Sequence, residues 1–488
     1  MQHIFRQFQP GPQSRDYLND TRRHVVTAAF GLPFYARCFL LSRLEGFLLC
    51  VVPDELEAER ARQALELFRG GRVEIIAQRE EVLLYKKAVS PDSCYRTFSA
   101  LFGMLRGNLS AAVITASALT RLFPSRSRFE AASFTLRLKE ETDLYGLIAR
   151  LVRAGYRREP KVTEKGQFSV HGDILDLFPV DADRPVRLEF FGDVIERMAN
   201  VDPETLKSVG ERDKVEVCPA TDILLEPEEI VSALAQMERE ARGLNIAPEA
   251  RARIRGVLAD VRSQLENGGR EISLSYVLPY APVTGGLADF LPPDATVALF
   301  DPKGISDHLR LLYAEHDARF DNLIKSGEIL PGHYGQLRNR LTLFEEFAPF
   351  CRTSFFNIAG GEIFRTDKIC NFKSLPSPRY HSRYDEFCRD AANWTLNGYR
   401  VVVAGRDRET CASAAEEIRA QGGHPVYCDD LLPPAPGVYL TPYELPGGFV
   451  LHESKLVVVG SGDLLRSKKT AVSRRKNQEV FTAPEVGD

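Results

Sequence analysis

The stretch from residue 153 to residue 208 reads RAGYRREPKVTEKGQFSVHGDILDLFPVDADRPVRLEFFGDVIERMANVDPETLKS and is dense in strand signals. Apolar and charged residues alternate along residues 185–191. Because successive side chains of a strand point to opposite faces of a sheet, this alternation predicts a strand with Arg187, Glu189 and Phe191 on one face and apolar residues on the other.

A second segment, residues 167–171, alternates in the same way. It predicts a neighbouring strand with Ser169 and His171 on the outward face and Phe168 and Val170 on the inward face. A small sheet with one apolar and one polar face is typical of packing on one side only. The outward face is then either a solvated surface, which alternation alone favours, or a surface that binds another protein. A mixed patch of charges with one aromatic side chain suits the second interpretation.

Three segments in this stretch carry a family resemblance: GYRR at 155–158, GQFSVHGDILDLFP at 166–179 and RLEFFGDVIER at 187–197. They resemble the second domain of the excision-repair protein UvrB and of the transcription-repair coupling factor, Mfd. In both families this domain is the docking surface for UvrA. The resemblance therefore implies a non-catalytic adapter that binds UvrA and recruits nucleotide excision repair in transcription-coupled DNA repair.

The resemblance also implies that UvrA contacts side chains of this region. The implied positions are Arg158, Ser169, His171, Arg187 and Glu189. Phe191, the aromatic side chain that the alternation places on the same face, is a further expected contact. The family often has arginine at the positions of Ser169 and His171, so the surface of this chain is less basic than the family pattern. Histidine titrates near neutral pH, and His171 therefore makes pH-sensitive binding an expectation.

A degenerate nucleotide site is a further implication of the resemblance. Residues 25–37 read VVTAAFGLPFYAR at the place where UvrB carries a phosphate-binding loop. Such a loop needs several glycines, a lysine and a serine or threonine, and only Gly31 remains here. On the acidic side, Asp301 is followed by Pro302 where a catalytic glutamate is needed. We therefore expect no catalytic residue, no cofactor and no metal; the rival interpretation is an ATP-dependent, UvrB-like DNA-binding helicase component.

Composition narrows the class of protein. The 488 residues suggest about three domains. With 63 Lys and Arg against 67 Asp and Glu, the net charge of −4 argues against a protein that mainly coats nucleic acid, so DNA contact is expected to be weak. The nine cysteines are dispersed without a CxxC pair, which is typical of reduced thiols in the cytoplasm. No apolar run reaches membrane-spanning length, so no membrane partner is expected.

The expected fold is a multi-domain α/β protein. The apolar run at 46–52 is typical of a buried parallel strand, and similar runs follow along the chain. The expected parts are a UvrB-like α/β domain in two pieces (1–135 and 213–350), a small β-rich α+β docking domain between them (136–212), a linker (351–380), and a small α/β domain with a basic C-terminal tail (381–488).

Two basic segments leave alternatives open. A helix with Arg251, Arg253, Arg255 and Arg262 is either a solvated face, which we favour, or a phosphate-contacting patch. The tail at 466–476 is either a solvated linker or a nucleic-acid contact. The segment GGFVLHESKLVVVGSGDLL at 447–465 resembles the third domain of Mfd. The family's RNA polymerase-binding and translocase domains would follow it, so RNA polymerase is an expected partner only of a full-length protein.

Overall fold

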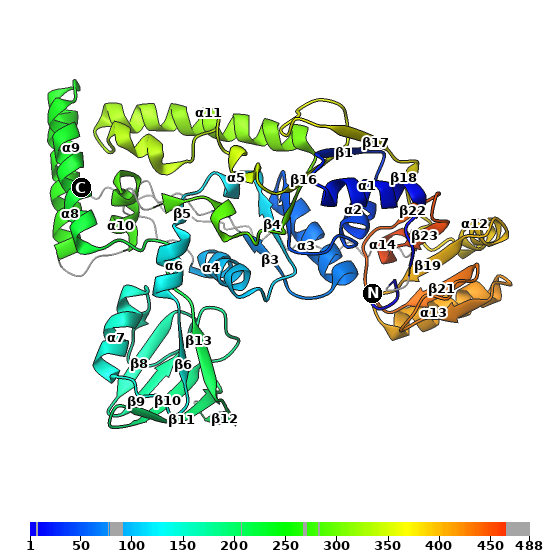
Figure 1. Cartoon of the computed structure of the whole chain (residues 1–488), viewed down its shortest axis with the longest axis horizontal. Helices are drawn as coiled ribbons and strands as arrows, with labels where there is room; N and C mark the ends of the chain where they lie inside the picture. The colour runs from blue at the N-terminus through cyan, green and yellow to red at the C-terminus, as the bar shows by residue number, and fades with distance from the viewer. Residues whose placement is uncertain are drawn as a thin grey trace, which may run out of the picture. The chain divides into compact units, whose positions relative to one another are not determined.

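The computed structural model describes residues 1–5, 8–76, 78, 91–205, 207–266, 271–281 and 284–464, and Figure 1 labels most of its helices and strands. The basic tail at 466–476 lies outside these residues. The chain divides into two compact units. The first comprises Met1–Leu375 with Leu451–Ser454, and the second comprises the described residues from Pro376 to Val450 and from Lys455 onward. Helices and several sheets alternate along the chain, which confirms the predicted multi-domain α/β class.

The first unit contains a seven-stranded sheet in the order β17-β1-β16-β15-β2-β4-β3, and all its paired neighbours run parallel. Its strands are β1 (Thr27–Phe30), β2 (Leu48–Val52), β3 (Val73–Ile76), β4 (Ala111–Thr115), β15 (Thr296–Phe300), β16 (Cys351–Phe356) and β17 (Lys368–Asn371). β2, β4 and β15 are buried at every position, as expected of parallel strands covered on both faces. Segments far apart in the sequence therefore build one sheet.

Residues 351–380 are not the linker that the sequence suggested. β16 lies inside the seven-stranded sheet, between β1 and β15, and β17 forms its edge. The sequence of β16, CRTSFF, carries polar residues that interrupt the apolar pattern. Those residues are satisfied inside the fold, since Thr27 Oγ1 donates to Thr353 Oγ1 at 2.8 Å and both side chains are fully buried.

Helices surround this sheet and connect its strands. They are α1 (Pro12–Arg22), α2 (Phe34–Leu41), α3 (Glu55–Arg69), α4 (Pro91–Arg106), α5 (Ala116–Leu119), α6 (Arg126–Ala132) and α11 (Pro302–Ser326), with the 3-10 turns η2 (Leu287–Phe290), η3 (Pro331–Gln336) and η4 (Glu345–Phe347). Asp54 caps α3 by accepting from Glu57 N–H at 2.9 Å. The short strands β5 (Phe123–Pro124) and β14 (Thr284–Gly285) pair with each other.

A β-rich insert, residues 134–217, interrupts the sheet domain between β4 and β15. Its six-stranded sheet has the order β12-β11-β10-β9-β8-β7 and is antiparallel except for the parallel pair β7 and β8. The strands are β7 (Arg157–Arg158), β8 (Gln167–His171), β9 (Ile174–Leu177), β10 (Val186–Phe191), β11 (Val194–Val201) and β12 (Ser208–Glu211). β6 (Phe134–Arg137) pairs with β13 (Lys214–Val217), so the insert extends beyond the predicted 136–212 at both ends.

One face of the insert's sheet packs on α7 (Leu144–Arg153), which lies against the strands in Figure 1. Leu147 and Leu151 of α7 share a core with Phe168 and Leu188, and all four side chains are buried. Asp143 begins α7 by accepting from Gly146 N–H at 2.8 Å. The sheet is therefore fixed from one side, and its other face points away from α7.

A helical part of the first unit has a separate apolar core. It comprises α8 (Pro227–Gly243), α9 (Pro248–Glu266), α10 (Glu271–Val277) and η1 (Leu278–Tyr280). Three of the four arginines on α9 already have partners. Arg251 donates to Leu244 O at 2.9 Å, Arg253 donates to Ser326 O at 3.2 Å, and Arg262 pairs with Glu238. These contacts favour a structural role for this basic helix over contact with phosphates.

The second unit is built on a six-stranded sheet in the order β18-β22-β23-β19-β21-β20, although the first residues of β18 and the last of β22 fall in the first unit. Its strands are β18 (Ser374–Pro376), β19 (Arg400–Ala404), β20 (Pro425–Tyr427), β21 (Gly437–Thr441), β22 (Phe449–Leu451) and β23 (Leu456–Val459), and its helices are α12 (Tyr384–Leu396), α13 (Arg408–Ala420) and α14 (Ser461–Leu464). β19 runs parallel to both β21 and β23, as in other small α/β domains.

Candidate protein-docking surface

The register of the insert's sheet places Ser169, Asp176 and Arg187 in one row across β8, β9 and β10. Arg187 holds Asp176 with two hydrogen bonds, from Nε to Oδ1 at 2.7 Å and from Nη2 to Oδ2 at 2.8 Å. The hydrogen bond to Asp176 raises the pKa of Arg187 further above its usual value. A two-pronged pair of this kind fixes the guanidinium in one orientation, half-buried on the sheet face.

Ser169 is not exposed on this face, contrary to the prediction. Its side chain has the outward phase of the strand but is only 2% exposed. Gln167, two residues earlier on the same face, is also buried. Its side-chain oxygen accepts hydrogen bonds from the backbone N–H groups of Thr163 and Glu164, which lie over it. The segment before β8 thus folds over this end of the sheet, and alternation alone could not reveal that cover.

The next row across the sheet contains His171, Ile174, Glu189 and Arg197. His171 is exposed, as predicted, and Glu189 is half-buried. Glu189 Oε1 accepts from Arg197 Nη1 at 3.0 Å, and Arg197 Nη2 also donates to Glu211 at 2.9 Å. Exposed pairs of this type contribute little to stability and can exchange partners readily, which suits a surface that binds another charged protein.

Phe191 lies at the end of β10 and is 80% exposed. It pairs with Val194 across a two-residue turn in which Gly192 has a φ of +60°. Sequence reasoning missed Tyr145, which is 83% exposed on α7. The signal was present, because Tyr145 directly follows the apolar position Leu144 yet lies outside the stripe that Leu147 and Leu151 extend.

Arg158 is exposed on the edge strand β7. It is in register with Phe168, whose side chain faces the core, whereas Arg157 is in register with Gln167. Paired residues share a face, so Arg157 has the same phase as Gln167, Ser169 and His171. Arg157 lies 3.7 Å from Glu164 in an exposed ion pair. The structure thus brings Arg187, Glu189, His171 and Phe191 to one face and leaves Arg158 at the edge with the opposite phase.

Gly31 follows β1 at the carboxyl edge of the seven-stranded sheet. It has a φ of +75°, and a Cβ added there would lie 2.2 Å from Phe372 O. In the helix that follows, the Phe34 ring packs against Phe300 with centroids 5.6 Å apart, and Arg60 lies 4.4 Å above the Phe34 centroid. Backbone and aromatic side chains therefore crowd the region where a phosphate-binding loop needs open space.

Asp301 lies at the same edge, because β15 and β1 both pair with β16. Its backbone is left-handed, with a φ of 56°, and among the described residues its Oδ1 has no hydrogen-bond partner. Nearby, Arg37 is buried, donates from Nε to Leu32 O at 2.8 Å and bonds Asn357. Burial lowers the pKa of Arg37, while the charges of Glu57 and Asp301 oppose that shift.

No group of three His, Cys, Asp or Glu side chains that could hold a metal ion occurs in the described part of the chain. The described helices also include none that is long and apolar enough to cross a membrane.

Comparison with known proteins gives a match to the family model described as the UvrB interaction domain at residues 134–222. This range begins with β6 and ends just beyond β13, so it coincides with the insert. A transcription-repair-coupling factor of Myxococcus xanthus is 34% identical over 289 residues, which are 56% of this chain and 24% of that protein. Those of Staphylococcus aureus (strain bovine RF122 / ET3-1) and Bacillus subtilis (strain 168) are 22% and 20% identical and cover 81% and 82% of this chain.

The chain spans between 24% and 35% of the length of these curated relatives. The family resemblance inferred from the segments at 155–158, 166–179 and 187–197 is confirmed, since all three lie inside the matched range. This chain therefore carries a UvrB interaction domain and is similar over most of its length to the transcription-repair-coupling factors.

Proposed function

We propose that this chain is a non-catalytic adapter in transcription-coupled DNA repair, which binds UvrA through the outer face of the insert's sheet. The observation that carries the proposal is the face itself. In a domain that matches the UvrB interaction family, Arg187 and Glu189 are held by pairs with neighbouring strands beside the exposed ring of Phe191. A guanidinium fixed in place, a carboxylate that can exchange its partner and one projecting aromatic ring suit specific protein recognition.

The roles of the residues follow from their contacts. Arg187 is oriented by Asp176 and can present its remaining N–H groups to an acidic partner without losing side-chain freedom. Glu189 can exchange Arg197 for a basic group of UvrA. Phe191 supplies the apolar contact, and Tyr145 is a second candidate ring on the same domain.

The lack of catalysis is proposed on the crowding around Gly31 and on Pro302, which follows Asp301 where a catalytic glutamate is needed. The ring of Phe34 and the buried Arg37 occupy the carboxyl edge where a nucleotide would need a glycine-rich loop with lysine. The relatives are named transcription-repair-coupling factors, so contacts with RNA polymerase and DNA are proposed only for a longer protein of that kind. We also propose a cytoplasmic location, as expected of a protein with this role in DNA repair.

The test is co-migration of the purified chain with UvrA in size-exclusion chromatography. The chain should co-migrate, and Phe191→Ala should weaken binding by roughly tenfold or more, as truncation of a central aromatic contact does. Leu396→Ala is the matched control, because Leu396 is 85% exposed in the second unit. The double change Arg187→Glu with Glu189→Arg should abolish co-migration.

Two results would overturn the proposal. One is failure of the unaltered chain to bind UvrA, and the other is full binding by both the Phe191 variant and the double variant. The latter result favours an adapter for a different partner. The rival enzyme interpretation is tested by calorimetric titration with magnesium and ATP, where a saturable signal would contradict the non-catalytic assignment.

A further inference from the structure

The two most exposed aromatic side chains in the described part of the insert lie at the same end of its sheet. Phe191 is 80% exposed and Tyr145 is 83% exposed. Phe191 ends β10 and pairs with Val194 of β11, and Val194 also forms a bridge to Glu141 on its other side. One row across three neighbouring segments therefore runs from Phe191 to Glu141, which lies just before α7.

Backbone hydrogen bonds tie the segment before α7 to the start of β11. Lys139 N–H donates to Ile195 O at 2.8 Å, and Ile195 N–H donates to Glu140 O at 3.2 Å. The segment thus runs antiparallel to β11 and reaches the end of the sheet where β10 turns into β11, which we call the turn end. Neighbouring strands lie about 4.8 Å apart, so Glu141 is about 10 Å from Phe191 across β11.

α7 begins at the turn end. Tyr145 lies in its first turn, and Asp143 accepts from the Tyr145 N–H at 3.0 Å. The Cα–Cβ bonds of a helix tilt toward its N-terminus, so the ring of Tyr145 leans toward the turn end. It also points away from the core that Leu147 and Leu151 enter. Tyr145 therefore places a second ring beside the end of the sheet that carries Phe191.

Another exposed apolar side chain lies near the turn end. Ile174 begins β9 in register with Glu189, on the outward face that Phe191 shares, and is 36% exposed. Apolar residues that are scattered singly over a surface are normal, whereas a group of them in one place marks an interaction site. Two large rings and Ile174 form such a group.

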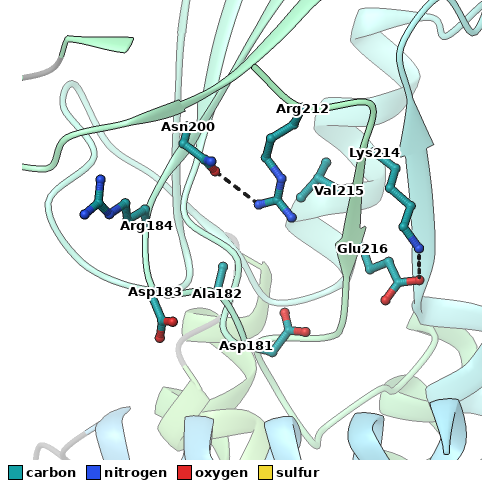
Figure 2. Close-up of a pocket in the computed structure, with 9 residues that line it drawn as sticks. All are labelled: Asp181, Ala182, Asp183, Arg184, Asn200, Arg212, Lys214, Val215 and Glu216. Atoms are coloured by element: carbon teal, nitrogen blue, oxygen red, sulfur yellow. Dashed lines mark hydrogen bonds and ion pairs between the residues drawn. The ribbon is translucent and has the colours of Figure 1, made fainter. Parts of the chain in front are cut away.

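The insert also contains a polar pocket, which offers a partner less. The pocket has a volume of about 530 Å³ and is lined in part by Asn200, Arg212, Lys214 and Glu216. Figure 2 shows that Arg212 bonds Asn200, at 3.2 Å, and that Lys214 lies beside Glu216, at 3.5 Å. These charges are compensated within the insert. The exposed rings at the turn end have no such cover.

We propose that the UvrA-docking surface continues from the outward face of the sheet around the turn end onto the first turn of α7. Tyr145 and Phe191 both contact UvrA, and Glu141 between them faces a basic side chain of UvrA. Glu141 suits this contact because it is exposed and forms no ion pair with another described residue. The inference rests on the proposed function, since the partner is the same, and it adds a second element to the contact.

The test is a calorimetric titration of UvrA with the whole chain and its variants. Tyr145→Ala should weaken binding roughly five- to tenfold, as truncation of an aromatic contact at an interface does. Its thermal unfolding should stay unchanged, because the ring is exposed. Val152→Ala is the matched control and should bind normally. Val152 is 55% exposed on the same helix, about 10 Å further from the turn end.

A second variant tests the charge at the turn end. Glu141→Lys should weaken UvrA binding, and the loss should shrink as the ionic strength rises, because salt screens exposed charges. Glu204→Lys is the control with the same change of charge. Glu204 is exposed beyond the other end of β11 and should tolerate the change.

The outcomes separate this inference from the proposed function. If Phe191→Ala weakens binding but Tyr145→Ala binds normally, the docking surface ends at the sheet, and the extension is overturned while the proposed function stands. Normal binding by Glu141→Lys overturns the assignment of a basic contact. If the unaltered chain does not bind UvrA, the proposed function and the extension both fall.

Discussion

Arg121 and Asp222 form an ion pair, with Nη2 and Oδ2 2.6 Å apart, and their side chains are only 4% and 2% exposed. Arg121 follows α5 in the sheet domain, whereas Asp222 lies just beyond β13 at the end of the insert. Arg121 Nη1 also donates to Thr97 Oγ1 at 3.2 Å. This pair therefore joins the exit of the insert to the body of the first unit.

Removing one member of this pair should destabilise the first unit strongly. Asp222→Ala leaves a buried guanidinium without its carboxylate, and such losses cost about 3–5 kcal/mol. Urea unfolding followed by circular dichroism measures the change. Arg126→Ala is the control, because Arg126 forms an exposed pair with Glu130 and its loss should cost less than about 0.5 kcal/mol. Equal effects of the two changes would contradict a structural role for the buried pair.

Gly31 should not tolerate a side chain. With a φ of +75° and Phe372 O 2.2 Å from an added Cβ, Gly31→Ala combines backbone strain with a steric overlap. The expected loss of stability is about 2 kcal/mol or more.

Gly256→Ala provides the opposite control for this change. Gly256 is exposed within α9, and an added Cβ meets no atom within 4 Å among the described residues. This change should stabilise the protein by about 0.5–1 kcal/mol, because alanine is the better helix former. Thermal unfolding measures the stability of both variants. If Gly31→Ala left the stability unchanged, the loop would be able to move away from Phe372.

The local alternation of apolar and polar residues predicted part of the candidate surface. The alternation along residues 185–191 assigns the two faces of β10 correctly, since side-chain phase in a strand depends only on neighbouring residues. It could not predict that Asp176 would pair with Arg187, because that contact depends on the register between β9 and β10. Nor could it predict the burial of Ser169, which depends on how the segment before β8 folds.

The contrast between local pattern and long-range contact also explains the largest error in the predicted architecture. The continuous apolar runs of β2 and β15 were recognisable in the sequence, because strands covered on both faces need apolar residues throughout. β16 is buried at every position but Arg352, and its Thr353 is accommodated by a hydrogen bond to Thr27, a residue more than 300 positions earlier. Long-range polar pairing of this kind leaves no local signal.

The pair between Asp176 and Arg187 should contribute to the stability of the insert as well as to its surface. Asp176→Asn removes the charge from a side chain that is 12% exposed and weakens two hydrogen bonds to the guanidinium. The expected loss is about 2 kcal/mol, the usual range for hydrogen bonds to charged groups. Glu211→Gln is the control, because Glu211 contacts Arg197 at an exposed position. Urea unfolding should separate the two variants, and equal stability of both would count against this contribution.

His333 should make the first unit sensitive to mild acid. Its ring is buried, with Nδ1 3.1 Å from Leu330 N and Nε2 3.1 Å from Tyr276 O. Burial lowers the pKa of His333 from 6.5 to about 4. Between these values the unfolded chain binds a proton that the folded chain does not, so the free energy of unfolding falls as the pH is lowered, by up to about 3 kcal/mol.

His333→Gln tests this effect, because glutamine keeps a donor and an acceptor but does not titrate. The variant should be less stable near neutral pH, yet its free energy of unfolding should fall less than that of the unaltered protein between pH 6.5 and about 4. His308→Gln is the matched control, since His308 is exposed on α11 in the same unit. Carboxyl groups titrate in the same pH range and also change the free energy of unfolding. The contribution of His333 is therefore the difference between the pH profiles of the His333→Gln and His308→Gln variants. Parallel pH profiles for His333→Gln and the unaltered chain would rule out His333 as the source.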